Sequence, residues 1–134
     1  MSDPLSGLHI LVVEDNPANL LLTQAVLQRS HCRISVAGSA AEVDRQIIRE
    51  LPDVILMDIQ LPGRDGLAIT RQLKANPSTA AIPIIALTAH AMKDDQDRVY
   101  QAGCDGYLAK PISVRTFAGE LALILDRARQ NQTR

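Results

Sequence analysis

Three stretches of this chain, Ile10-Leu-Val-Val-Glu14-Asp15, Val54-Ile-Leu-Met-Asp58 and Tyr107-Leu-Ala-Lys110-Pro111, each end an apolar run with an acidic or a basic side chain. If the runs are neighbouring parallel strands, three carboxylates and one ammonium group converge at the carboxyl edge of one sheet, where open α/β folds place their sites. Such carboxylates repel one another unless a hard divalent cation binds their oxygens and Lys110 offsets the remaining charge. The three stretches therefore predict a magnesium site that handles a phosphoryl group.

Apolar runs of strand length alternate five times with segments of helical pattern. The predicted strands are 9–13, 33–37, 53–57, 83–87 and 106–109. Nearly continuous apolar runs are typical of strands that are buried on both faces, as in a parallel sheet. Because crossovers between parallel strands are right-handed, the pattern predicts an α/β fold of (βα)5 type. We expect a doubly wound, five-stranded parallel sheet in the order 2-1-3-4-5, which is the flavodoxin-like order.

Capping signals mark the starts of the first two helices. Asn16-Pro17 places an N-cap residue before a proline at the first helical position. Ser39-Ala-Ala-Glu42 is a capping-box pattern, and it opens a helix that is predicted to run to about residue 49. The side chains predicted to face inward from these two helices are Leu20, Val26, Leu27, Val43, Ile47 and Ile48.

The other three helices are predicted mainly from their ends. The third is expected over 66–74, before Asn76-Pro77, and the fourth over 92–102, where Gly103 acts as a C-terminal stop. Ser113 is predicted to cap the fifth helix, which is expected to end before a polar tail over 129–134.

Length and composition favour one globular domain, spanning 1–134 with a core over about 8–128. The net charge of -1 and the 2% aromatic content argue against nucleic acid as a partner. No apolar run approaches the roughly 20 residues of a membrane span, and the N-terminus lacks a signal-peptide pattern, so we expect a cytoplasmic protein. Cys32 and Cys104 lack C-x-x-C spacing and are expected to be reduced thiols.

Four motifs at the ends of the predicted strands match a known family. They are Glu14-Asp15 after the first strand, Asp58 after the third, Thr88-Ala89 after the fourth and Lys110-Pro111 after the fifth. With these motifs in this order, the chain resembles the receiver domain of bacterial two-component response regulators over almost its whole length. Its local sequence is most similar to single-domain cell-cycle regulators and to receivers attached to hybrid histidine kinases.

The resemblance implies that Asp58 is the phosphoacceptor and takes a phosphoryl group from a histidine of a kinase or of a phosphotransfer protein. It also implies a Mg²⁺ site, with Mn²⁺ as an acceptable substitute. Asp15 would bind the ion directly, Glu14 mostly through water, and Gln60 through its backbone carbonyl, together with Asp58. In this chemistry the protein contributes positioning and electrostatic stabilisation, because a carboxylate can attack phosphorus only when the charge is neutralised.

The same resemblance assigns roles around the phosphoryl group. Lys110 would contact its oxygens as a point charge, and the Thr88 hydroxyl as a hydrogen-bond donor. Gln60 and His90 occupy the positions that tune the lifetime of the phosphoryl group in the family, and the peptide bond before Pro111 would be cis.

Tyr107 is predicted to take part in a two-state switch with Thr88. It lies on the fifth strand, three residues before Lys110, and this strand neighbours the fourth, which ends at Thr88. If the phosphoryl group draws Thr88 inward, the Tyr107 ring can fill the space left beside it and leave the surface.

Three other functions fit the sequence less well than this one. A phosphatase of the haloacid-dehalogenase class also uses a strand-end aspartate with Mg²⁺, but its second aspartate is replaced here by Gln60, which cannot relay a proton. A flavodoxin would need a phosphate loop where Glu14-Asp15 stands. A pseudo-receiver that works without phosphorylation would not need the complete set of acids, threonine and lysine.

The expected partners are a histidine kinase or histidine phosphotransfer protein and a downstream protein target, reached through protein contacts. We expect a monomer or a weak dimer, with neither nucleic acid nor membrane as a partner. Met1, shortly before the first predicted strand, favours a free-standing protein, although a fragment of a hybrid kinase stays open as an alternative.

Overall fold

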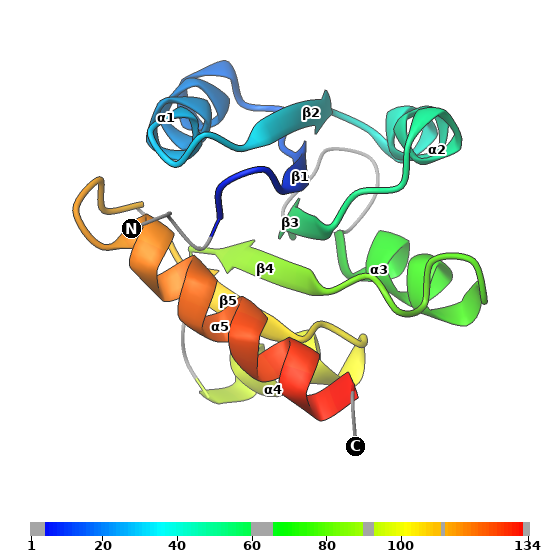
Figure 1. Cartoon of the computed structure of the whole chain (residues 1–134). Coiled ribbons are helices and arrows are strands. Elements are labelled where there is room, and N and C mark those ends of the chain that lie inside the picture. The colour runs from blue at the N-terminus through cyan, green and yellow to red at the C-terminus, as the bar shows by residue number, and fades with distance from the viewer. Residues whose placement is uncertain (1–4, 60–65, 90–92, 111, 133–134) are drawn as a thin grey trace.

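The computed structural model describes residues 5–59, 66–89, 93–110 and 112–132, along which strands and helices alternate (Figure 1). The strands are β1 (His9–Val13), β2 (Arg33–Ala37), β3 (Val54–Asp58), β4 (Ile84–Thr88) and β5 (Gly106–Ala109). The helices are α1 (Pro17–Gln28), α2 (Ala40–Arg49), α3 (Gly66–Ala75), α4 (Lys93–Gln101) and α5 (Phe117–Gln132).

The strands form one parallel sheet in the order β2-β1-β3-β4-β5. Helices α1 and α5 lie on one face of this sheet, and α2, α3 and α4 lie on the other (Figure 1). The predicted fold class and strand order are therefore confirmed. Among the described residues, no helix combines the length and the apolar character that crossing a membrane requires.

Each face of the sheet has its own buried core. The two-helix core lies under α1 and α5, and the three-helix core lies under α2, α3 and α4. Because successive strand residues point to opposite faces, each inner strand contributes alternate residues to both cores. The buried members of the two-helix core include Ile10, Val12, Leu27, Leu56, Leu87, Leu108 and Leu121. Those of the three-helix core include Leu11, Val13, Val43, Met57, Leu67, Ala86 and Val99.

The predicted helix signals are present as hydrogen bonds. The Asn16 side chain accepts from the backbone N–H groups of Ala18 and Asn19, so it caps α1. Ser39 caps α2 by accepting from the Glu42 N–H, and the Glu42 carboxylate accepts in turn from the Gly38 N–H.

After α4 the chain turns through Gly103. Its φ is +107°, its N–H donates to the Tyr100 carbonyl, and the Cys104 N–H donates to the Val99 carbonyl. This pair of bonds is the Schellman motif, in which glycine is the favoured residue. The prediction that Gly103 stops the fourth helix is confirmed.

Three details differ from the sequence predictions. Strands β3 and β4 begin and end one residue later than expected, so Asp58 and Thr88 are the last residues of their strands. Helix α5 begins at Phe117 because residues 114–116 form a turn, in which the Ser113 carbonyl accepts from the N–H groups of Thr116 and Phe117. The helix then continues to Gln132 instead of ending before 129.

Ile48 was predicted to face inward and does not. Its side chain is 84% exposed, whereas Val43 is fully buried and Ile47 is half-buried against the three-helix core. Residues four apart share a helix face, and Ile48 lies one further step of about 100° around α2 from Ile47. The inward stripe of this helix is therefore narrower than its apolar content suggested.

Candidate functional site: an acidic cluster with one lysine

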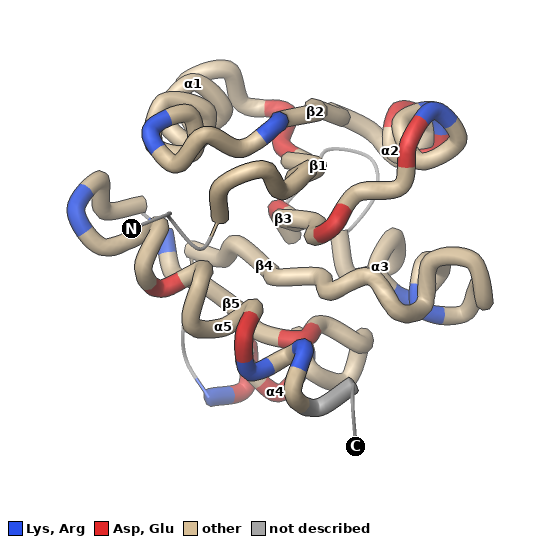
Figure 2. The backbone as a smooth tube through the Cα atoms, in the orientation of Figure 1, with Lys and Arg blue, Asp and Glu red and all other residues tan. Residues whose placement is uncertain are grey.

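The strand register places Glu14 beside Asp58. Val13 pairs with Met57 across β1 and β3, so the residues that follow them, Glu14 and Asp58, also lie side by side. Val12 and Leu56 belong to the two-helix core. Glu14 and Asp58 come two residues later along the chain, so strand alternation turns their side chains toward the face of that core. Both carboxylates are buried, and Figure 2 marks the acidic ends of β1 and β3.

Lys110 joins the two buried acids. Its Nζ lies 3.2 Å from Asp58 Oδ1 and 3.3 Å from Glu14 Oε1. Lys110 follows β5, and its backbone N–H donates to the Thr88 carbonyl at 2.8 Å, which holds the chain after β5 against the end of β4. Charges that are taken out of water need partners, and this lysine pairs with both acids.

Asp15 completes a set of three carboxylates. One oxygen from each of Glu14, Asp15 and Asp58 lies within 4.8 Å of the others, with Asp15 exposed and the other two buried. Hard divalent cations such as Mg²⁺ and Mn²⁺ prefer carboxylate oxygens, and Mg²⁺ keeps several waters. A site of this donor type, open to solvent on the Asp15 side, fits such an ion. The three acids named from the sequence thus come together as predicted.

Burial is the main cause that raises the pKa of Glu14 to about 7. The hydrogen bond to Asp58 and the repulsion of its charge raise this pKa further, while Lys110 and the Asn16 N–H lower it. In the absence of a cation, the cluster therefore holds a proton on Glu14 near neutral pH.

Thr88 and Tyr107 lie on the other face of the sheet. Ala86 pairs with Tyr107 and Thr88 with Ala109 across β4 and β5, and side chains that are paired in this way share a face. Ala86 belongs to the three-helix core, and Tyr107 packs against the same core. Thr88 and Tyr107 are therefore diagonal neighbours on that face, and the small side chains of Ala86 and Ala109 occupy the other diagonal.

Two residues near the site had no assigned role in the sequence analysis. Gly66 opens α3 and donates its N–H to the Ile59 carbonyl, and a Cβ atom there would collide with the backbone of Asp58 and Ile59. Glycine at this position lets α3 begin directly against the end of β3. Tyr100 contacts Tyr107 from α4. A glycine at the start of a predicted helix was a visible signal for Gly66. Nothing in the local sequence points to Tyr100.

Three of the named residues, Gln60, His90 and Pro111, lie outside the described part of the chain. The backbone-carbonyl ligand predicted at Gln60, the tuning role of Gln60 and His90, and the cis peptide bond at Pro111 therefore stay predictions.

Comparison with known proteins gives two kinds of relative. The polar-differentiation response regulator DivK of Brucella ovis is 42% identical over 108 residues, which are 81% of this chain and 88% of DivK. The sensor protein GacS of Pseudomonas syringae pv. syringae is also 42% identical, over 114 residues that are 82% of this chain. The chain spans only 12% of the length of GacS, so this likeness concerns one part of a longer protein.

Solved structures show the same fold. The receiver domain of the sensor histidine kinase PA1611 from Pseudomonas aeruginosa has a TM-score of 0.77 and 39% identity, covers 91% of this chain and 97% of that one, and has a magnesium ion coordinated in its active-site cleft. The Mn²⁺-bound form of response regulator Rcp1 has a TM-score of 0.73 and 26% identity, and covers 87% of this chain and 91% of that one.

Residues 10–121 match the family described as the response regulator receiver domain. This match covers more than half of the chain, and its limits enclose the three acids, Thr88 and Lys110. The family match decides against a phosphatase and against a flavodoxin as the function of this chain. The chain belongs to the response regulator receiver domain family, whose members are signalling phosphoacceptors of two-component systems rather than enzymes that turn over external substrates.

Proposed function

We propose that Asp58 is the phosphoacceptor of this receiver domain. The supporting observation is the convergence of three carboxylates and Lys110 at the carboxyl edge of the sheet, with Lys110 Nζ 3.2 Å from Asp58 Oδ1. A carboxylate oxygen of Asp58 forms the new bond to phosphorus. The bond from phosphorus to the histidine nitrogen of the donor breaks, and its electron pair leaves with that nitrogen.

The remaining residues position and neutralise the incoming charge. Glu14, Asp15, Asp58 and the Gln60 carbonyl would hold Mg²⁺ or Mn²⁺, in keeping with the ions in the PA1611 and Rcp1 structures. When bound, such an ion offsets the negative charge of the phosphoryl oxygens. Lys110 shifts from its acidic partners to a phosphoryl oxygen, and the Thr88 hydroxyl donates to another.

We further propose that phosphorylation couples Thr88 to Tyr107. Thr88 lies on the face of the three-helix core, whereas Asp58 points to the opposite face. To reach a phosphoryl oxygen, the Thr88 side chain must turn toward the carboxyl edge of the sheet. That movement vacates space diagonal to Tyr107, where the alanines at 86 and 109 offer little bulk, and the ring can enter it.

A histidine kinase is the partner that membership of this family implies. We propose a phosphotransfer protein as an alternative donor and a downstream protein as the target. The unit is proposed to work as one receiver domain spanning 1–134, as a monomer or weak dimer in the cytoplasm. Kinship with DivK supports this setting, and so do Cys32 and Cys104, neither of which is in a disulfide.

The phosphoacceptor assignment is tested by intact-mass measurement with a small acyl-phosphate donor. We expect one added phosphoryl group on the wild-type protein in Mg²⁺, and none on Asp58→Asn or after chelation of the metal. Asp44→Asn, an exposed aspartate on α2, is the matched control and should be phosphorylated normally. Undiminished phosphorylation of Asp58→Asn would overturn the assignment.

A further inference from the structure

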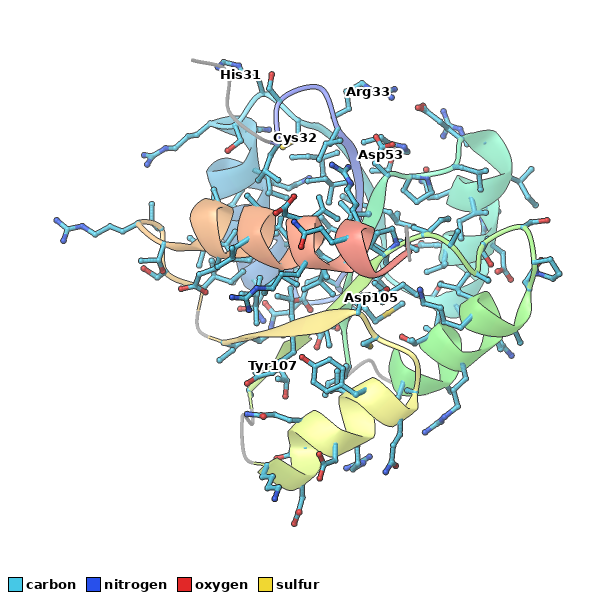
Figure 3. All side chains as sticks on the ribbon, turned by 60° about the horizontal axis from the view of Figure 1, so that its bottom comes forward. His31, Cys32, Arg33, Asp53, Asp105 and Tyr107 are labelled. Atoms are coloured by element: carbon cyan, nitrogen blue, oxygen red, sulfur yellow. The ribbon has the colours of Figure 1, made fainter. Side chains whose placement is uncertain are left out.

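Tyr107 has an aromatic neighbour that the phosphoryl chemistry does not use. The rings of Tyr100 on α4 and Tyr107 on β5 meet edge to face, with centroids 6.2 Å apart and an interplanar angle of 82°. Figure 3 shows Tyr107 extending from β5 toward α4. Aromatic pairs favour this geometry because the positive edge of one ring meets the negative face of the other. The contact therefore stabilises the present position of the Tyr107 ring.

The surroundings of the pair leave the Tyr107 ring room to move. Both rings line a pocket of about 340 Å³ between α4, β5 and α5, together with Ile124 and Arg127. Tyr107 is half-buried and Tyr100 is 51% exposed, so neither ring is fixed by complete burial.

The contact with Tyr100 exists in only one of the two positions of the Tyr107 ring. Helix α4 starts after the carboxyl end of β4 and ends before the amino end of β5, so Tyr100, in its last turn, lies toward the amino edge of the sheet. Thr88, the last residue of β4, lies at the opposite, carboxyl edge. A movement of Tyr107 toward Thr88 therefore takes the ring away from Tyr100. A group can bias a two-state equilibrium only through contacts that differ between the two states. The contact between Tyr100 and Tyr107 is such a contact.

We propose that Tyr100 is a positioning residue that holds Tyr107 in its unphosphorylated position and so sets how many molecules have switched before phosphorylation. This inference rests on the proposed coupling of Thr88 to Tyr107. An edge-to-face pair changes an equilibrium by about 2- to 12-fold. Loss of the Tyr100 ring is therefore expected to raise the ratio of switched to unswitched molecules by about this factor.

The two tyrosines are the only ones in the chain, which makes the test direct. Protein labelled with 3-fluorotyrosine gives one ¹⁹F signal for each, and Tyr100→Leu and Tyr100→Phe each retain the Tyr107 signal alone. Tyr100→Leu removes the ring, whereas Tyr100→Phe keeps the ring and serves as the matched control. Signal position and relaxation dispersion, which detects minor conformers, give the switched ratio without a phosphodonor and with acyl phosphate and Mg²⁺.

We expect the ratio in Tyr100→Leu to exceed that in Tyr100→Phe by about 2- to 12-fold, with a cooperative unfolding transition in both variants. Equal ratios, or a lower ratio in Tyr100→Leu, would overturn the role of Tyr100 while leaving the coupling intact. If the Tyr107 signal of Tyr100→Phe and of the wild-type protein does not move although intact mass confirms phosphorylation, the coupling itself is wrong and the inference falls with it.

Discussion

At Glu14, burial disfavours the charge of the carboxylate. It is 2% exposed and lies against Asp58, and its pKa is raised to about 7, first by burial and then by that neighbour. A carboxyl whose pKa is higher in the folded than in the unfolded state favours folding when it is protonated. This contribution is complete below pH 4.5, the ordinary value, and is lost as the pH rises through about 7.

Metal-free protein is therefore expected to lose stability between pH 4.5 and 7, by roughly 3 kcal/mol from this group. Glu14→Gln removes the titration, because an amide of similar shape carries no charge. We expect the variant to lack this pH-dependent loss and to be more stable than the wild-type protein at pH 8 in a chelator. Urea unfolding of both proteins at pH 5 and pH 8 measures the difference.

Glu42→Gln is the matched control, since Glu42 is an exposed acid on α2. Added Mg²⁺ should flatten the pH profile of the wild-type protein, because the cation favours the ionised carboxylate. Parallel pH profiles for the wild-type protein and Glu14→Gln in chelator would contradict the assigned cause.

The acids and the lysine were predictable as individual residues because each ends an apolar run, and parallel strands bring such ends to one edge. The protonation of Glu14 near neutral pH could not be predicted from the sequence, since it depends on how completely the side chain is buried. The Tyr100–Tyr107 contact joins α4 to β5 across a turn, and local sequence carries no sign of which face of α4 meets the ring.

Helix α1 presents apolar surface beside the site. Leu21 is 69% exposed, and Asn19 and Leu22 of the same helix line a small pocket with Lys110 and Ile112. Because α1 borders the phosphoacceptor site, we expect the exposed side chain of Leu21 to contact a partner that docks there. Helix α1 carries more leucines than one buried stripe uses, which leaves some of them at the surface.

We expect Leu21→Lys to slow phosphotransfer from a phosphohistidine donor by about tenfold, the effect of losing roughly 1.4 kcal/mol of contact. Transfer from a small acyl phosphate should keep its wild-type rate, because that donor makes no contact with α1. Rates with both donors can be followed by intact mass over time.

The matched control is Ile48→Lys on α2, which places the same charge on an exposed isoleucine of another helix. It should leave both rates unchanged. If Leu21→Lys slows both donors equally, or neither, α1 is not the docking surface.

The limits of the helices and strands were predictable where a capping residue marks them and less so elsewhere. Asn16, Ser39 and Gly103 fixed three helix ends, whereas α5 begins four residues after Ser113 because the Ser113 carbonyl closes a turn instead. The amino ends of β4 and β5 are tied by Asp105, which accepts from the Ile84 N–H and from Lys74 Nζ, both at 2.9 Å. No sequence pattern signals such a long-range bridge.

On the scale of the whole molecule, the residues of the proposed chemistry and those of the proposed response lie on opposite faces of the sheet. Glu14, Asp58 and Lys110 follow core residues of the face covered by α1 and α5, whereas Thr88 and Tyr107 lie on the face covered by α2, α3 and α4. The two faces meet at the carboxyl edge, where β4 ends at Thr88 and the Lys110 N–H donates to the Thr88 carbonyl. In the proposed coupling, the signal from Asp58 passes over this edge to the opposite face through the Thr88 side chain.

Replacement of Thr88 by alanine tests this passage while leaving Asp58 able to accept a phosphoryl group. A charge-assisted hydrogen bond contributes roughly 1.5–3 kcal/mol, which corresponds to about a ten- to hundredfold change in the population of the switched state. Without the hydroxyl, the phosphoryl group loses the Thr88 donor on the Tyr107 face, so the NMR shifts around Tyr107 on phosphorylation should largely vanish. Thr88→Ser keeps the hydroxyl and should retain most of them, with intact mass confirming that both variants are phosphorylated. Shifts of wild-type size in Thr88→Ala would mean that the signal reaches Tyr107 by another route.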